Sequence, residues 1–269
     1  MPGFASMQPT GFLGIDLGSS YTKFVVIDSG KEMVYQAVIP TLSRRKERFQ
    51  EILDTINQHY AIKSICTTGY GRTSYSGDLE KTELICAAVG VTALHPVEKC
   101  IIDIGGEDIK IIECDAKGAV EHFYMNDKCS SGTGAFITEI AEKAELEINE
   151  MSRLAQASQS TRIMNSFCTV FAKTEILNWK FSGVPLEDMA RGIYLSIVNR
   201  IRKMPVRSDR PVYLCGGVIA YHPFLKVLLS DALGVPVEVT DKPQYIIALG
   251  AAVLARQSVP KSTLEHAEA

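Results

Sequence analysis

Residues 15–28 read IDLGSSYTKFVVID, and residues 102–115 read IDIGGEDIKIIECD. The aspartate, first glycine and lysine of the first stretch (positions 16, 18 and 23) recur in the second at a constant offset of 87 residues. Each copy predicts an apolar strand that ends in a carboxylate, a tight glycine turn and a second apolar strand. Because an internal repeat dictates architecture, the chain is expected to fold as two related halves with a cleft between them.

The two glycine turns have the composition of a phosphate-binding site. Glycine lets the backbone approach a ligand closely, and successive N–H groups in such turns bind anions. Magnesium takes one or two carboxylates together with phosphate oxygens, so Asp16 and Asp103 are expected to organise a magnesium ion and water, with Glu107 or Asp103 positioning the attacking water. The residues expected to hold the phosphates are Gly18, Ser19, Ser20, Lys23, Gly105 and Gly106. A single copy alone would leave open an ordinary β-hairpin with a polar turn.

Length and composition describe an ordinary soluble globular protein. The 269 residues are 46% apolar and 22% charged, and the formal net charge of −3 offers no basic field for nucleic acid. No uninterrupted apolar run is long enough to cross a bilayer, and no secretory leader is evident at the first residues, so no membrane partner is expected. The odd number of cysteines, seven, without close spacing favours a reducing, cytoplasmic location.

Strand and helix patterns alternate along the chain, which predicts an α/β fold of sheets covered by helices. The first domain is expected over residues 11–95 together with 244–258, and the second, longer domain over 96–243, while residues 1–10 and 259–269 are expected to be flexible. Beyond the repeat, strands are predicted over 34–39, 62–67, 120–124, 212–215 and 235–239. Helices are predicted over 43–59, 81–94, 133–144, 148–157, 168–179, 186–204, 224–233 and 245–255.

The other glycine motifs exclude several common sites. Gly132-Thr133-Gly134 and Gly69-Tyr70-Gly71 lack the third glycine and the strand–helix context of a dinucleotide fingerprint. The phosphate loop that ends in Gly-Lys-Ser/Thr and the serine-hydrolase elbow do not occur. Gly216-Gly217 follows a predicted strand and is a candidate adenosine contact, although a plain strand-to-helix turn would have the same sequence.

Two cysteines differ from the others in their surroundings. Cys129 lies among small, polar and charged residues, beside Lys128 and just ahead of a predicted helix, and these features favour the thiolate that binds metals or attacks electrophiles. Cys168 lies near the start of another predicted helix, where burial in the core is the ordinary alternative. Two thiolates cannot complete the four ligands of an iron–sulfur cluster, but a symmetric dimer with two cysteines per subunit could. The alternative is a pair of inert or merely reactive cysteines.

Taken together, these segments resemble a known family. It comprises the ATP-dependent activators of 2-hydroxyacyl-CoA dehydratases and the ATPase subunits of benzoyl-CoA reductases, the BadF/BadG/BcrA/BcrD type, within the actin–hexokinase–acetate-kinase-like ATPases. The most specific segment is Asn126-Asp127-Lys128-Cys129 followed by Gly132-Thr133-Gly134. The matching stretches are residues 14–20, 68–72, 101–108, 125–134, 168–172, 216–218 and 248–252.

The resemblance implies two actin/ribonuclease H-like domains with ATP in the cleft between them. It implies a homodimer that shares one 4Fe–4S cluster, with Cys129 and Cys168 at the ligand positions, and it places Gly132, Gly134, Gly216 and Gly217 among the cofactor contacts. Such proteins couple ATP hydrolysis to the delivery of a low-potential electron to a partner iron–sulfur dehydratase or reductase, with ferredoxin or flavodoxin as the donor. This chain differs from the usual family pattern at Glu107, Lys173 and Tyr221, where glutamine, an acidic residue and asparagine are common.

Two other functions are compatible with the repeat. A small-molecule kinase of the same superfamily, acting on a sugar or a carboxylate, would also use the glycine turns and Gly216-Gly217, but it gives Cys129 no purpose. A nucleotide-sensing scaffold without catalysis would bind ATP but would neither turn it over nor hold iron.

Overall fold

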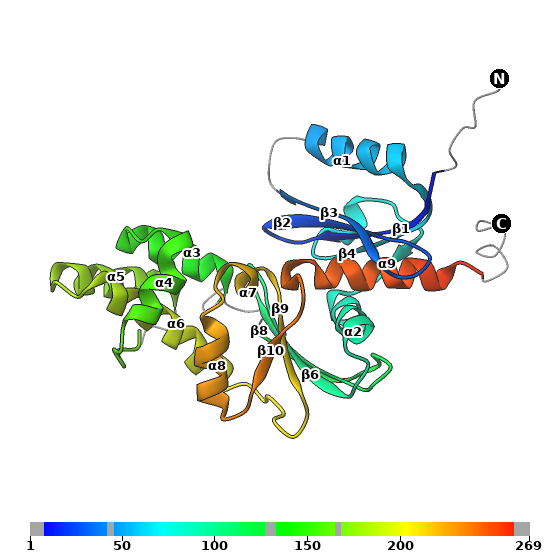
Figure 1. The fold of residues 1–269 in the computed structure, drawn as a ribbon. Helices are drawn as coiled ribbons and strands as arrows, with labels where there is room; N and C mark the ends of the chain where they lie inside the picture. Colours follow the sequence, from blue (N-terminus) through cyan, green and yellow to red (C-terminus); the bar gives the residue numbers. More distant parts are fainter. Residues whose placement is uncertain (1–7, 42–45, 127–132, 165–167, 261–269) are drawn as a thin grey trace. The chain divides into compact units, whose positions relative to one another are not determined.

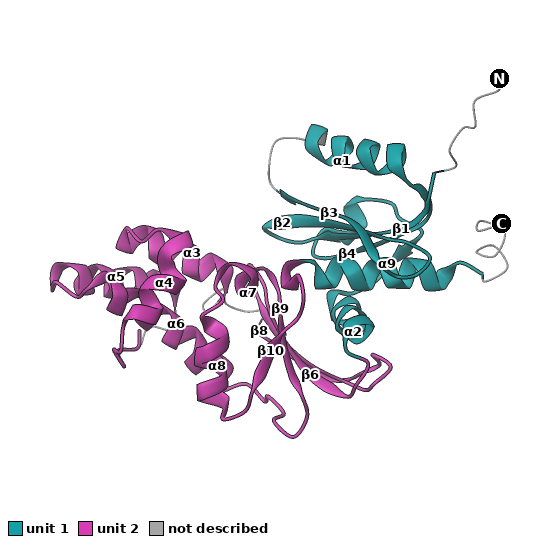
Figure 2. Cartoon of the chain, viewed as in Figure 1, with its two compact units in different colours: residues 1–95, 245–269 teal, residues 96–244 magenta. Residues whose placement is uncertain are grey.

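The computed structural model describes residues 8–41, 46–126, 133–164 and 168–260. The chain divides into two compact units, one formed by residues 1–95 and 245–269 and the other by residues 96–244 (Figure 2). Each unit is built on one five-stranded sheet that is covered by helices. The predicted α/β class is therefore confirmed.

The sheet of the first unit has the strand order β3-β2-β1-β4-β5. The β1–β2 and β2–β3 pairs are antiparallel, whereas β1–β4 and β4–β5 are parallel. In the register of this sheet, Asp16 at the end of β1 lies opposite Lys23 on one side and Thr68 on the other. The strands are β1 (Thr10–Leu17), β2 (Tyr21–Ile27), β3 (Met33–Pro40), β4 (Ala61–Thr68) and β5 (Leu79–Glu80).

The sheet of the second unit repeats this topology strand for strand, in the order β10-β9-β6-β7-β8. The pairs β6–β7 and β7–β8 are antiparallel, and β6–β9 and β9–β10 are parallel. Asp103 lies opposite Lys110 on one side and Cys215 on the other, as Asp16 does in the first sheet. The strands are β6 (Lys99–Ile104), β7 (Ile109–Cys114), β8 (Val120–Asn126), β9 (Val212–Cys215) and β10 (Val237–Val239).

Three helices cover the first sheet: α1 (Lys46–His59), α2 (Glu83–Leu94) and α9 (Ile246–Ser258) (Figure 1). Thr82 caps α2 by accepting a hydrogen bond from the Ile85 N–H. Helix α9 packs on α2 and β1 through glycines. A Cβ atom at Gly250 would overlap the carbonyl oxygen of Cys86, and one at Gly14 would overlap that of Ala248. Backbones come this close only where side chains are absent, so these glycines set the spacing of the layers.

The second unit carries an additional block of helices that shares one apolar core with its sheet. This core includes one face of β6 and β7 and the buried faces of α3, α5 and α6. Among the described residues no helix combines the length and apolarity that a membrane span requires. The helices are α3 (Gly134–Ala144), α4 (Met151–Ala157), α5 (Thr169–Phe181), α6 (Leu186–Ile201), α7 (Gly217–Tyr221) and α8 (Leu225–Leu233).

The predicted elements differ from the observed ones in short segments. The helix predicted over 148–157 begins with a 3-10 turn, Ile148–Glu150, and becomes an α-helix only from Met151. The strand predicted over 235–239 begins at Val237, and the helix predicted to reach Met204 ends at Ile201. Strand β5 and helix α7 were not predicted, because two and five residues are too few to show a periodic pattern.

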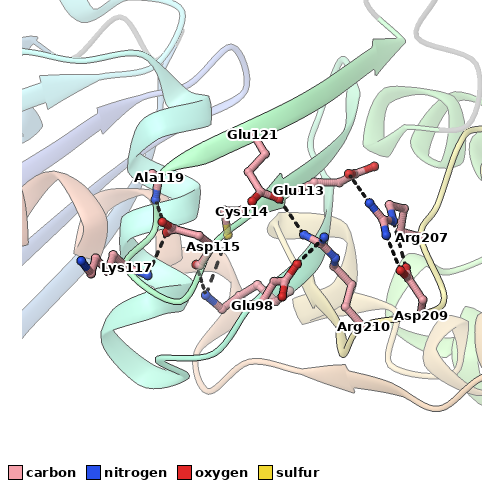
Figure 3. A network of polar contacts seen from close by, with 11 residues as sticks. Glu98, Glu113, Cys114, Asp115, Lys117, Ala119, Glu121, Arg207, Asp209 and Arg210 are labelled. Atoms are coloured by element: carbon pink, nitrogen blue, oxygen red, sulfur yellow. Dashed lines mark hydrogen bonds and ion pairs between the residues drawn. The ribbon is translucent and has the colours of Figure 1, made fainter.

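A network of ion pairs holds the segment that leads into β9 against strands β7 and β8 and the residue that precedes β6 (Figure 3). Arg210 pairs with Glu98 and, at 2.9 Å, with Glu121, while Arg207 lies 3.8 Å from Glu113. Glu98 precedes the first residue of β6, whereas the glycine turn follows its last residue. The network therefore lies at the opposite end of β6 from the glycine turn, and we assign it a structural role.

Candidate functional site

The glycine turn of the first unit places a buried carboxylate beside an ammonium group. Asp16 is only 2% exposed, and Lys23 Nζ donates to its Oδ2 at 2.9 Å across the β1–β2 pair. A Cβ atom at Gly18 would lie 2.8 Å from the carbonyl oxygen of Tyr21, so the turn requires glycine there. Thr41, the residue after β3, donates from Oγ1 to the Gly18 carbonyl at 2.7 Å and so holds the turn. Ser19 is half-buried and Ser20 is exposed, and both flank this carboxylate in the chain.

The turn of the second unit repeats the pair of aspartate and lysine. Asp103 is 1% exposed, and Lys110 Nζ lies 3.5 Å from its Oδ2 and 2.5 Å from Asp108 Oδ1. The Gly105 N–H donates to the Asp108 carbonyl at 2.9 Å, which closes the turn. Gly106 is half-buried and Glu107 is exposed. In each turn a lysine offsets part of the cost of burying the carboxylate.

A second glycine lies against each carboxylate, and the sequence pattern identified only one of the two as a site residue. Gly69 follows β4 with φ +94°, and a Cβ atom there would lie 2.7 Å from Asp16 Oδ1 and 2.5 Å from the Leu17 carbonyl oxygen. Gly216 follows β9 with φ +100°, and its Cβ would lie 2.5 Å from Asp103 Oδ1. The two glycines are therefore equivalent, each at the end of the strand that runs parallel to the aspartate strand.

The constant offset of the repeat does not extend to Gly69 and Gly216. Gly69 follows Asp16 by 53 residues, whereas Gly216 follows Asp103 by 113, because the additional helices are inserted between β8 and β9. In the sequence, Gly69 is marked only by its position after a predicted strand. It is also the first residue of Gly69-Tyr70-Gly71, which lacks the third glycine of a dinucleotide fingerprint.

We expect a side chain at Gly69 to lower the free energy of unfolding by more than the positive φ alone explains. Gly69→Ala combines a positive φ with overlap against Leu17 and Asp16, so unfolding in denaturant should show a loss of about 3 kcal/mol or more. Gly234→Ala is the matched control, since φ is +70° there but no atom lies within 4 Å of the added Cβ, and it should cost about 1 kcal/mol. Equal losses in the two variants would show that close approach to Asp16 is not what requires glycine.

The first turn of α3 is hydrogen-bonded to the glycine turn of the second unit. The Gly134 N–H donates to the Gly105 carbonyl at 3.0 Å, and the Ala135 N–H donates to the Gly106 carbonyl at 2.8 Å. Because the Gly105 carbonyl accepts the hydrogen bond of the Gly134 N–H, Gly134 is part of the contact between α3 and the turn. Gly132, which the family resemblance places among the cofactor contacts, lies outside the described residues. These two hydrogen bonds join the Gly105-Gly106 turn to the first turn of α3.

Cys168 lies at the N-terminal end of α5. It is the N-cap residue of this 13-residue helix, is only partly exposed, and its carbonyl accepts a hydrogen bond from the Ala172 N–H at 2.9 Å. A helix N-terminus favours an anionic group. Val170 and Phe171, two and three residues after Cys168, are 68% and 69% exposed, which is unusual for neighbouring apolar side chains.

The remaining described cysteines are buried. Burial raises the pKa of the Cys100 thiol to about 11, and desolvation together with Asp103 raises that of Cys215 well above its usual value. Such thiols are poor ligands for a metal. Cys129 lies outside the described residues. Among the residues that are described, no three His, Cys, Asp or Glu side chains come together in a group that could hold a metal ion.

Two of the three positions that depart from the family pattern lie on the helices around this region. Lys173 of α5 forms an ion pair with Glu139 of α3. The positive charge that replaces the family's acidic residue is therefore compensated within the unit, and the ion pair joins the two helices. Tyr221, the last residue of α7, is half exposed. Gly217 begins that helix, and nothing lies within 4 Å of a Cβ placed on it. The cleft expected between the two halves depends on how the units are placed and stays a prediction.

The comparisons with known proteins agree with this description. The model of the BadF/BadG/BcrA/BcrD ATPase family matches residues 13–255. An activator of lactoyl-CoA dehydratase from Anaerotignum propionicum is 34% identical over 257 residues, which are 93% of this chain and 98% of the relative. The (R)-2-hydroxyglutaryl-CoA dehydratase activating ATPase of Acidaminococcus fermentans is 33% identical over 259 residues, 93% of this chain and 98% of its own.

A solved structure extends the similarity to three dimensions. The activator of the 2-hydroxyisocaproyl-CoA dehydratase from Clostridium difficile, with bound ADPNP, superposes with a TM-score of 0.86 at 32% identity, covering 95% of this chain and 98% of that one. The repeated sheets and the family match over residues 13–255 lead to one assignment. The chain is an ATPase and belongs to the BadF/BadG/BcrA/BcrD ATPase family.

Proposed function

We propose that the protein hydrolyses ATP to drive a low-potential electron into a partner iron–sulfur enzyme of the acyl-CoA dehydratase or reductase type. The relatives named as dehydratase activators support this function. The observation that carries it is the pair of hydrogen bonds from the first turn of α3 to the Gly105 and Gly106 carbonyls. Because α3 follows the segment of the sequence that contains Cys129, a change at this turn on phosphate binding would reach the cysteine region through α3.

We assign phosphate binding to each glycine turn. Gly18, Ser19 and Ser20 of the first turn would offer N–H and hydroxyl donors, and Gly105 and Gly106 would do so in the second. Lys23 and Lys110 each place a positive charge beside the aspartate of their turn. Gly216 and Gly217 would contact the adenosine. Phosphoryl transfer depends mainly on positioning and charge neutralisation, so this set is sufficient without a dedicated strong base.

Asp16 and Asp103 suit a magnesium ion. Both are carboxylates at strand ends, and glycines Gly69 and Gly216 leave the space beside one oxygen of each free of any Cβ atom. The ion would neutralise charge on the phosphates. Glu107 is exposed on its turn and, with Asp103, is the candidate for orienting the attacking water.

We assign Cys129 and Cys168 as ligands of a 4Fe–4S cluster shared by two copies of the chain. Cys168 fits this role through its partial exposure, its position at a helix N-terminus and its exposed apolar neighbours, which a second copy would cover. Two cysteines from each of two subunits make the four thiolates that such clusters require. The cluster would supply one-electron transfer, with reduced ferredoxin or flavodoxin as the donor.

Protein purified without oxygen tests this function. We expect a brown dimer with about four irons per dimer that hydrolyses ATP without any added acceptor. Colourless protein that releases ADP only when a sugar or carboxylate is present would instead establish a small-molecule kinase. Binding of ATP with neither turnover nor iron would establish a nucleotide sensor.

A further inference from the structure

A chain of hydrogen bonds runs through the core of the second unit. The Tyr194 hydroxyl lies 2.6 Å from His222 Nδ1 and 3.2 Å from Ser152 Oγ. The Phe224 N–H lies 3.5 Å from the same Ser152 oxygen. Tyr194 is completely buried and His222 is 5% exposed. The chain therefore joins α4, α6 and the connection between α7 and α8.

The chemistry of the four groups sets the direction of the hydrogen bonds. The Phe224 N–H can only donate, so Ser152 Oγ accepts from it and its own hydrogen is free for Tyr194. Desolvation lowers the pKa of His222 to about 4, so its imidazole is neutral at pH 7 and Nδ1 can accept from the Tyr194 hydroxyl. Each group thus has a partner, and the removal of one leaves another buried and unsatisfied.

The chain begins next to the residues assigned to the nucleotide. His222 is the residue after α7, and α7 begins at Gly217, directly after Gly216. At its other end lie α4 and α6, which pack on each other, and α6 also packs on α3. Helix α3 in turn packs on α5, the helix that begins after Cys168.

Arg191 of α6 makes a second contact with the same connection. Its guanidinium lies over the Phe224 ring, 5.7 Å from the centroid, and Nη1 donates to the Ala155 carbonyl of α4 at 3.2 Å. The residues 222–224 are therefore held by both helices. A shift of α7 cannot occur without either breaking these contacts or moving α4 and α6.

We propose that His222 is a positioning residue, and that the His222–Tyr194–Ser152 chain sets the positions of α4 and α6 according to the nucleotide bound at Gly216-Gly217. This inference rests on the proposed function, because it requires that Gly216 and Gly217 contact the nucleotide. It adds a second route to the helical block, separate from the hydrogen bonds between α3 and the Gly105-Gly106 turn. The role is mechanical, since none of the three side chains is assigned to ATP.

The fold offers a matched control. Ser158, the residue after α4, donates to Asp188 of α6 at 2.7 Å and is almost fully buried. This hydrogen bond joins the same two helices but includes no residue of α7 or of the connection that follows it. Ser158→Ala therefore removes a comparable α4–α6 contact and leaves the link to the nucleotide turn intact.

Amide hydrogen exchange in α4 and α6 tests the inference on the anaerobically purified dimer, in the absence of nucleotide, with MgADP and with a non-hydrolysable MgATP analogue. In the unsubstituted protein we expect the exchange rates in these helices to differ by about fivefold between the two nucleotides. This ratio corresponds to the net free energy of one neutral hydrogen bond. In Tyr194→Phe and His222→Leu this difference should vanish, while the Kd for MgADP changes by less than about fivefold. Ser158→Ala should speed exchange in every state but keep the difference between the two nucleotides. His222→Asn should also keep this difference, because the asparagine side chain can still accept a hydrogen bond from Tyr194.

Each outcome decides the inference. A nucleotide-dependent difference that persists in Tyr194→Phe, or that disappears equally in Ser158→Ala, would overturn it. Unchanged exchange in an unsubstituted protein that binds MgADP would also overturn it, while leaving the proposed function intact; failure to bind nucleotide at all would remove both. Should Tyr194→Phe not fold, Ser152→Ala breaks the same chain at its half-buried end and carries the same expectation.

Discussion

Asp16→Asn is expected to lower kcat for ATP hydrolysis by about 10²- to 10³-fold, the loss that follows removal of one preorganised electrostatic group from an active site. The substitution keeps the shape of the side chain and its ability to accept from Lys23, but it removes the negative charge that would hold magnesium. Steady-state ADP release under saturating MgATP measures the effect. Near-normal turnover would remove Asp16 from the catalytic site.

Asp28→Asn provides the control from the same repeat. Asp28 follows β2, at the end of the hairpin away from the glycine turn, where its Oδ1 accepts the Glu32 N–H at 2.9 Å. Asparagine can accept this hydrogen bond, so turnover should stay within about twofold of the unsubstituted enzyme, as is usual for a surface substitution of small free energy. A large loss in both variants would indicate damage to the hairpin rather than to a metal site.

Cys168→Ala is expected to reduce bound iron to less than about a tenth, because a cluster with two missing ligands per dimer is not retained. The Kd for MgATP should remain measurable, since Cys168 begins α5 and belongs to neither glycine turn. Cys129→Ala should behave in the same way. Iron analysis and visible absorption under anaerobic conditions give the readout, and unchanged iron content would contradict the assignment.

Cys100→Ala separates ligation from the general effect of losing a thiol. Cys100 is buried in β6, and its raised pKa, about 11, keeps it protonated. Its replacement should retain iron at a cost of about 1 kcal/mol in unfolding free energy, as for the loss of one small buried group. Together with Asp16→Asn, which should keep its iron, the series tests whether hydrolysis and cluster binding can be lost separately.

Sequence patterns predicted the architecture well where elements are long and periodic. The 87-residue repeat predicted two related halves, and both sheets have the same strand order and the same register at Asp16 and Asp103. The apolar strands around each glycine turn bury their side chains as their composition requires. The family resemblance is likewise confirmed. Short elements such as α7 escaped prediction, because five residues do not complete two helical turns.

What the sequence determined by itself was local: where a strand ends in a carboxylate, where a turn requires glycine, and that this unit occurs twice. The tertiary structure alone decided which distant residues meet these units. In the folded protein Gly69 contacts Asp16, and the Gly134 N–H donates to the Gly105 carbonyl. Hydrogen bonds also connect His222 through Tyr194 to Ser152. The physical reason is that strand and turn patterns arise from neighbours within a few residues, whereas these contacts depend on how parallel strands and inserted helices pack, and their separations along the chain follow no fixed period.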